Sequence, residues 1–136
     1  SVEKLAEVAQ QIESGGAEVL QIQADVSGVD DAKRIVSETI EKFGKIDSLI
    51  NNAGITKDNL LIRLKEQDWD SVMAVNLKGS FNCLKAAARP MMRQRSGKII
   101  NMSSVVGMMG NAGQVNYAAS KAGIIGMTKA AAKELA

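Results

Sequence analysis

The sequence is poor in the residues that most often carry catalysis, metal binding and cross-linking. Its 136 residues include no histidine, one cysteine (Cys83), one proline, one tyrosine and one tryptophan. Without histidine or a second cysteine, a histidine-based triad, a disulfide scaffold and most zinc sites are excluded. Any acid–base chemistry therefore falls to carboxylates, lysine, serine or the single tyrosine, Tyr117.

Long apolar runs and a strong net charge are also absent. No uncharged apolar stretch approaches the roughly 18 residues that a membrane-spanning helix needs. The 17 Lys and Arg against 15 Asp and Glu leave a formal charge of +2, too small to indicate nucleic acid as the main partner. We recognise no secretory signal, and one thiol suits a reducing compartment. A cytoplasmic location of bacterial type is therefore expected, with an organelle as the alternative.

An alternation of helical and strand-like patterns runs along the chain. Helical periodicity recurs four times, with short apolar runs typical of buried strands between the helices. This order predicts an α/β fold, a parallel sheet with both faces covered by helices. Because neither terminal helix has a recognisable cap, we expect a single partial domain over residues 1–136, truncated at both ends. The expected helices are Ser1–Ser14, Val29–Phe43 with Gly44 as its cap, Trp69–Arg95 kinked or frayed at Pro90, and Val115–Ala136; the expected strands are Ala17–Val26, Lys45–Ile50 and Lys98–Met102.

The clearest chemical signal is a tyrosine followed four residues later by a lysine, Tyr117 and Lys121. On a helix, side chains at this spacing share a face, with about 5–6 Å between their Cβ atoms. A lysine ammonium in that position favours the phenolate form of the tyrosine, which would help the phenol to exchange a proton with a substrate. The same spacing also occurs on ordinary amphipathic helices, so the pair alone does not decide the function.

Polar or small residues follow each of the expected strands. Ser104 follows the third strand and precedes Tyr117 by 13 residues, while Asn51–Gly54 and Asp25–Val26 end the other two. Ligands of open α/β sheets bind at the carboxyl ends of the strands, where a serine hydroxyl can hold a carbonyl oxygen. The alternative is that these residues only form turns. Asn76 lies within an expected helix, although asparagine is a mediocre helix former.

Together these residues resemble the short-chain dehydrogenase/reductase family, and within it the 3-oxoacyl-[acyl-carrier-protein] reductase branch. The resemblance covers essentially the whole chain, and its most specific stretches are Asn51–Leu61, Lys98–Gly107 and Gly110–Gly123. It implies a Rossmann-like doubly wound parallel sheet that is incomplete in this chain. The family's glycine-rich phosphate-binding turn, its first two strands and its final strands have no counterpart in the sequence.

The resemblance also implies roles for individual residues. Tyr117 would be the general acid, and Lys121 would bind the nicotinamide ribose and favour the phenolate. The substrate would be oriented by Ser104 rather than Ser103, because Ser104 has the family's spacing to the tyrosine. Asn76 would hold a water molecule in a proton relay that reaches the lysine. The remaining cofactor contacts would be Asp25 and Val26 at the adenine end, and Asn52, Ala53 and Gly54 along the adenosine ribose.

The implied activity is reduction of a 3-oxoacyl-acyl-carrier-protein thioester to the 3-hydroxyacyl form in type II fatty-acid synthesis. NADP(H) is favoured over NAD(H) as cofactor, and no metal, nucleic acid or membrane partner is expected. The two long helices are expected to form a homotetramer. Two alternatives stay open: a related enzyme acting on sugars, alcohols or polyhydroxyalkanoate precursors, and a non-catalytic scaffold subunit of the same fold.

The missing strands lead to a structural prediction. In the family's strand order, 3-2-1-4-5-6-7, the strand near Leu20 is the third and the strand near Leu49 is the fourth. The first and second strands belong between them, so Val19–Ala24 should form no ladder with Lys45–Ile50. Because the phosphate-binding turn is also missing, the 136-residue chain alone should be inactive and should not bind cofactor measurably.

Overall fold

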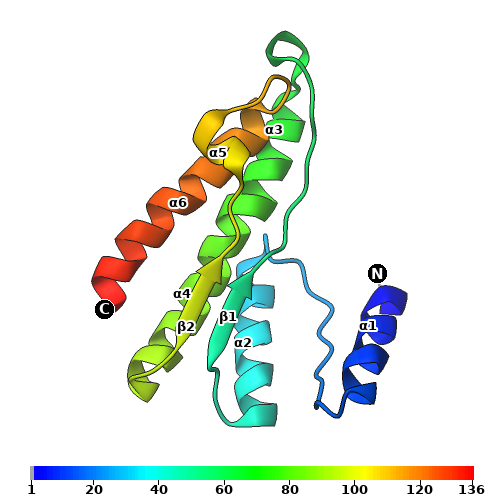
Figure 1. The fold of residues 1–136 in the computed structure, drawn as a ribbon, viewed down its shortest axis with the longest axis vertical. Coiled ribbons are helices and arrows are strands. Elements are labelled where there is room, and N and C mark those ends of the chain that lie inside the picture. Colours follow the sequence, from blue (N-terminus) through cyan, green and yellow to red (C-terminus); the bar gives the residue numbers. More distant parts are fainter. Residues whose placement is uncertain (1) are drawn as a thin grey trace.

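The computed structural model describes residues 2–136 and contains a two-stranded parallel sheet with helices packed on one of its faces (Figure 1). Strand β1 (Ser48–Asn51) pairs in parallel with β2 (Lys98–Asn101), residue for residue from Ser48 opposite Lys98. The predicted α/β class with a parallel sheet is therefore confirmed, in an incomplete Rossmann-like form. The other elements are α1 (Val2–Ser14), α2 (Val29–Phe43), the 3₁₀ turn η1 (Leu61–Arg63), α3 (Glu66–Val72), the π-helical segment η2 (Met73–Lys78), α4 (Gly79–Gln94), α5 (Val105–Met109) and α6 (Val115–Leu135).

Helix α2 has the boundaries that its sequence predicts. Asp30 and Asp31 lie in its first turn and Lys42 in its last, so the charges complement the helix dipole. Gly44 ends the helix in the left-handed conformation, with φ 82°, and its amide donates to the Ile40 carbonyl. A glycine adopts this conformation without the steric penalty that a side chain would bring.

The core lies between helices α2 and α4 and one face of the sheet. Leu49 of β1 and Ile99 of β2 pack into it, whereas their neighbours Ile50 and Ile100 are 60% and 48% exposed. The expectation that both faces of the sheet are buried is therefore wrong for this chain. No described helix covers the second face of these strands well enough to bury the two isoleucines. The other core residues are Val36, Ile40, Ile46, Ala86, Ala87 and Met91.

The segment 17–26 forms no strand, contrary to the expectation. A strand needs a neighbouring strand. Within residues 2–136, no backbone hydrogen bond joins this segment to β1 or to residues 45–47, which precede β1. Side chains of α2 bond its carbonyls instead: Lys42 donates to Val19 at 2.7 Å and Arg34 to Gln23 at 2.6 Å. The predicted lack of pairing with β1 is thus confirmed.

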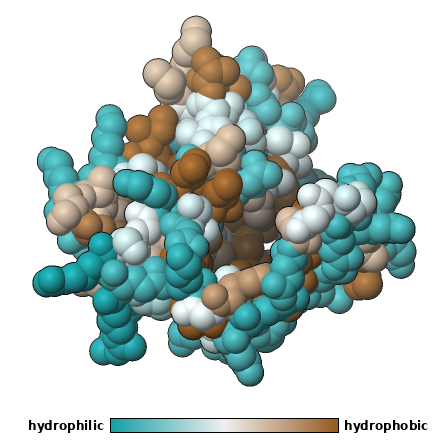
Figure 2. Space-filling view, turned by 60° about the horizontal axis from the view of Figure 1, so that its bottom comes forward, coloured by the Kyte–Doolittle hydropathy of each residue, from teal (hydrophilic) through white to brown (hydrophobic). Residues whose placement is uncertain are grey.

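Helix α1 presents an uncovered apolar stripe. Val2, Leu5, Val8 and Ile12 are between 37% and 54% exposed, although their spacing is that of a core-facing helix. In Figure 2 the surface is hollowed next to the part of the molecule that projects at the right, and apolar side chains lie in this hollow. An apolar stripe next to a hollow is the arrangement expected where sheet strands are missing.

The long helical region differs from the prediction in two places. It begins at Glu66 rather than Trp69, and it continues past Pro90 to Gln94, so the expected fraying at Pro90 is wrong. Proline has a φ angle that fits a helix, and so close to the end it removes only one hydrogen bond. The irregular part is instead η2, where the backbone is π-helical from Met73 to Lys78.

Candidate active site

Helix α6 brings Tyr117 and Lys121 to the wall of one cavity of about 590 Å³. The Lys121 Nζ lies 5.7 Å from the centroid of the Tyr117 ring, so the two side chains are neighbours on one helix face, as predicted. Lys121 is only 5% exposed, and its ammonium donates to the Met102 carbonyl at 2.9 Å. Burial lowers the pKa of this lysine below its usual value. The remaining lining residues are Asn52, Gly54, Ile55, Thr56, Lys57, Met102 and Ser103.

A close crossing of α5 and α6 fixes the position of Lys121. A Cβ at Gly107 would lie 2.7 Å from the carbonyl carbon of Lys121 and 2.8 Å from the Ala122 nitrogen, so only glycine fits there. The Ser103 hydroxyl also donates to the Lys121 carbonyl at 2.8 Å. These contacts press the lysine-bearing turn of α6 against the segment that follows β2.

Asn76 is completely buried and its amide is fully hydrogen-bonded. Its Oδ1 accepts from the Ile55 amide at 2.8 Å, and its Nδ2 donates to the Ile55 carbonyl at 3.0 Å and to the Ser120 hydroxyl at 3.2 Å. The Ser120 hydroxyl in turn donates to the Tyr117 carbonyl at 2.8 Å. Asn76 belongs to the π-helical segment, a distortion that often occurs at functional sites. It therefore connects the cavity wall at Ile55 to the helix that carries Tyr117.

The residues after β1 form the rim of the cavity. Asn52 and Gly54 line it, whereas Ala53 does not; all three are exposed. A Cβ placed on Gly54 would lie 3.4 Å from the Asn76 Oδ1 and 3.7 Å from the Lys121 Nζ. Asn76 and Lys121 therefore come together beside Gly54, as the predicted site requires.

Ser104 and Ser103 differ in what they contact. Ser104 is the N-cap of α5, and its Oγ accepts from the Val106 amide at 3.2 Å. It does not line the cavity, whereas Ser103 does. Ser104 therefore has a local structural role at the start of α5, as the turn-forming alternative predicted. The role of Ser104 in orienting a substrate stays a prediction. Helix α5 (Val105–Met109) is an additional element, because the sequence pattern predicted no helix between the third strand and Val115.

Asp25 and Val26 lie outside the residues that line this cavity. The Asp25 carboxylate accepts from the Ser27 hydroxyl at 2.7 Å and the Ser27 amide at 2.9 Å, and these bonds lower its pKa. The Val26 carbonyl accepts from Asn82 at 3.0 Å. A Cβ on Gly79 would lie 2.6 Å from the Val26 side chain, so this turn packs closely on the start of α4. Their predicted contact with adenine stays a prediction.

The sequence analysis missed a series of buried amides and one hydroxyl. Asn51 donates to Asn101 at 2.8 Å, joining the ends of β1 and β2, and Asn101 donates to Thr128 of α6 at 2.9 Å. One feature of the sequence could have identified the asparagines: asparagine has a poor intrinsic propensity for helices and strands, yet it occurs within them here. Residues with buried side chains that the sequence analysis did not single out include Asn82, Asn116 and Ser120.

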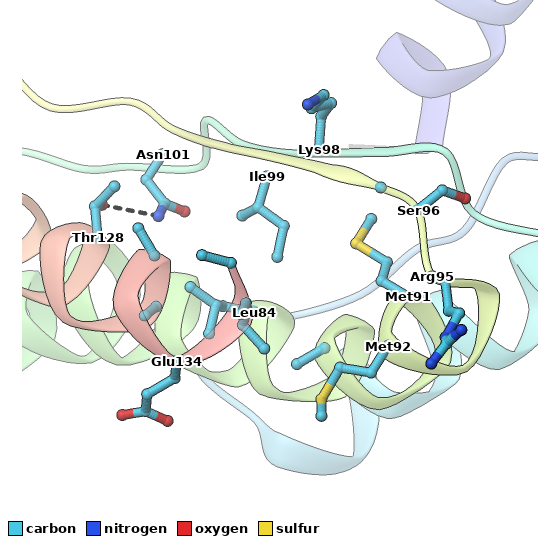
Figure 3. A pocket seen from close by; sticks show the side chains of 16 residues that line it. Leu84, Met91, Met92, Arg95, Ser96, Lys98, Ile99, Asn101, Thr128 and Glu134 are labelled. Carbon is cyan, nitrogen blue, oxygen red and sulfur yellow. Dashed lines mark hydrogen bonds between the residues drawn. The ribbon is translucent and has the colours of Figure 1, made fainter.

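A larger cavity of about 800 Å³ lies among α4, β2 and α6 (Figure 3). Met91, Met92 and Ile99 border it, and it contains none of the predicted site residues. Within residues 2–136 there is no group of three or more side chains suited to a metal ion, and no helix is long and apolar enough to cross a membrane.

The smaller cavity fits one end of a nicotinamide cofactor. A lysine ammonium has three donors, and Lys121 uses one of them on the Met102 carbonyl, so two can bond ribose hydroxyls. The other end is not provided for, because the sequence has no G-x-G-x-x-G turn to hold the phosphates. The donor set therefore matches the nicotinamide ribose and not the pyrophosphate.

Comparison with known proteins agrees with this geometry. The family model for short chain dehydrogenase matches residues 1–136, so the chain belongs to the short-chain dehydrogenase family. The chain is 55% identical over its whole length to the 3-oxoacyl-[acyl-carrier-protein] reductase FabG of Staphylococcus aureus strain Mu50, covering 55% of that protein. It is 53% identical over 129 residues to a 3-oxoacyl-[acyl-carrier-protein] reductase of Synechocystis, covering 95% of the chain and 52% of the relative. The chain thus spans about half the length of the curated relatives it matches.

Proposed function

We propose that this chain is the central part of an NADPH-dependent reductase of 3-oxoacyl-acyl-carrier-protein thioesters in type II fatty-acid synthesis. The proposal rests mainly on one observation: Tyr117 and the buried Lys121 line the same cavity, with the Lys121 Nζ 5.7 Å from the ring centroid. The names of the relatives supply the substrate class, since the chain is 53–55% identical to two 3-oxoacyl-[acyl-carrier-protein] reductases.

In the proposed mechanism the protein binds the ketone and delivers a proton to it. A nicotinamide bound beside Lys121 would supply the hydride for the β-carbon. Tyr117 donates its phenolic proton to the carbonyl oxygen as negative charge develops there, and Ser104 holds that oxygen. Lys121 stabilises the resulting phenolate and bonds the ribose hydroxyls. Lys121 then passes a proton to the phenolate, which restores the phenol, and a water relay that includes Asn76 returns a proton to Lys121 for the next cycle.

Substitution of Tyr117 by phenylalanine tests the mechanism in the full-length protein that contains this chain. We expect Tyr117→Phe to lower kcat for an acetoacetyl thioester by about 10²–10⁴-fold, because general acid catalysis contributes roughly that factor. NADPH oxidation gives the rate, and NADPH fluorescence gives the dissociation constant. Binding should change little, since the ring remains and only the hydroxyl is lost.

The exposed Phe43 supplies the matched control. The Phe43→Tyr variant adds a phenol at the end of α2, outside the helices assigned to the tetramer, and should keep the parental rate, because Phe43 is 41% exposed and does not line the cavity. Equal rates for Tyr117→Phe and the parent would contradict the enzyme proposal and favour the scaffold alternative. Activity on sugars or simple alcohols but not on the thioester would favour a different member of the family.

The proposal extends to partners and location. The acyl-carrier-protein thioester is the substrate, and NADPH is preferred to NADH, which a comparison of the two initial rates tests. The assembly is a homotetramer through the region of α3–α4 and through α6, which sedimentation of the full-length protein measures. A bacterial-type cytoplasmic location follows from the same assignment.

A further inference from the structure

Asn116, the residue before Tyr117, is 0% exposed and uses both ends of its side-chain amide. Its Nδ2 donates to the Lys57 carbonyl at 2.9 Å and to the Asp68 carbonyl at 3.4 Å. Its Oδ1 accepts from the Tyr117 amide at 2.8 Å. That amide lies in the first turn of α6, where backbone donors have no partner within the helix.

These bonds connect three parts of the fold at the cavity. Lys57 belongs to the segment after β1, Asp68 belongs to α3, and Asn116 and Tyr117 begin α6. Lys57 and Tyr117 both line the cavity. The bond from Asn116 to the Lys57 carbonyl therefore determines how far the tyrosine-bearing turn lies from the opposite wall.

Two further hydrogen bonds join the segment after β1 to the residues around the start of α6, a contact that we call the seam. The Asn59 amide donates to the Gly113 carbonyl at 2.9 Å, and the Gln114 side chain donates to the Asp58 carboxylate at 3.3 Å. The latter pair is exposed, so water can replace it. Asn116 differs from this pair because its own side-chain amide is fully buried, so its hydrogen bonds are not open to replacement by bulk water.

We infer that Asn116 is a positioning residue that holds Tyr117 in register with the opposite cavity wall for proton transfer. The inference rests on the proposed reductase function for its kinetic part only. Asn116 does not touch the reacting atoms, and it acts through the position of its neighbour. A misplacement of about 1 Å can lower a rate by about 10²-fold, so a loosened seam should affect turnover more than cofactor binding.

Two substitutions in the full-length protein separate the effect of the Asn116 bonds across the seam from the effect of its bond to the Tyr117 amide. Asn116→Asp keeps the shape and the Tyr117 bond but turns a carboxylate oxygen toward the Lys57 and Asp68 carbonyls. Asn116→Ser stays neutral and is too short to reach the Lys57 carbonyl. Asn111→Asp is the matched control: it makes the same amide-to-acid change in the loop just before α6, where Asn111 is exposed and bonds Gln114.

We expect both Asn116 variants to lower kcat for an acetoacetyl thioester by about 10–100-fold. The NADPH dissociation constant should stay within about twofold, because Asn116 lies outside the cavity lining. Asn111→Asp should match the parent. The inference is overturned if both Asn116 variants keep kcat within about twofold of the parent, or if kcat falls only in proportion to NADPH-binding capacity, as for partial unfolding.

Near-ultraviolet circular dichroism gives a second readout that needs no activity. Tyr117 and Trp69 are the only tyrosine and tryptophan of this chain. To isolate these two signals, the spectrum of the full-length variant is subtracted from that of the full-length parent. We expect Asn116→Ser to weaken the tyrosine band while the far-ultraviolet helix signal stays. If the parent reduces no 3-oxoacyl thioester, the proposed function fails, and this spectrum alone decides the inference: an unchanged tyrosine band overturns it.

Discussion

At the residue scale, the buried ammonium of Lys121 links function to stability. Burial lowers its pKa from the usual 10.5, so the folded state releases this proton at a lower pH than the unfolded state. At a pH below the lowered pKa both states hold the proton, and the folded state bears the full desolvation penalty. As the pH rises through the lowered pKa, the unfolded state binds more protons than the folded state, and folding becomes more favourable.

The Lys121→Met variant tests this linkage, since it keeps an unbranched side chain without the charge. We expect the unfolding free energy of the parent, relative to the variant, to rise with pH as the pH approaches 10.5. The slope cannot exceed about 1.4 kcal/mol per pH unit for one proton. Urea unfolding at a series of pH values measures it, and Lys129→Met on the exposed side of α6 controls for the loss of one lysine. A difference that falls with pH would contradict the assignment.

The roles that could be predicted at this scale were those that depend on local spacing. Tyr117 and Lys121 are one helical turn apart, so their proximity follows from the sequence alone. Asn116 and Ser120 could not be identified in this way, because their partners are 59 and 44 residues away in the chain. Such contacts depend on how the elements pack, which a local pattern does not specify.

At the element scale, glycines mark the places where α5 and α6 approach other backbone or side chains. Gly107→Ala would place a methyl group 2.7 Å from the Lys121 carbonyl carbon, which is backbone and cannot rotate away. We expect a loss of about 1–3 kcal/mol in unfolding free energy, as for other overpacked sites. Gly126→Ala is the control: a Cβ there meets nothing within 4 Å, and it should stabilise α6 by up to about 1 kcal/mol. Urea titrations of both variants check the opposite signs.

The element boundaries show which sequence signals are strong. Gly44 and the charges of α2 gave the helix end correctly, because a C-cap is a local interaction. Segment 17–26 has the composition of a strand but forms none, because a ladder is made by two partners. Residues 73–78 adopt a π-helix, for which the side-chain periodicity of the sequence gave no indication.

At the scale of the whole molecule, the described chain contains the residues proposed for proton transfer but no glycine-rich turn for the phosphates. Tyr117 and Lys121 line the cavity, whereas no glycine-rich turn accompanies them. The stripe of α1 and the exposed Ile50 and Ile100 are apolar surfaces that no element within residues 2–136 buries. The chain covers 55% of the Staphylococcus aureus relative.

The 136-residue chain alone should therefore not bind NADPH measurably, whereas the full-length protein should. Pyrophosphate groups are held by a ring of backbone amides at a helix N-terminus, and without it the two free donors of Lys121 provide too little binding energy. Titration of NADPH fluorescence with each protein measures the difference. Saturable binding by the 136-residue chain that is lost in Lys121→Met would contradict the prediction, because it would mean that the ribose end of the site suffices. Saturable binding that survives Lys121→Met would also contradict it and would place the cofactor outside this cavity.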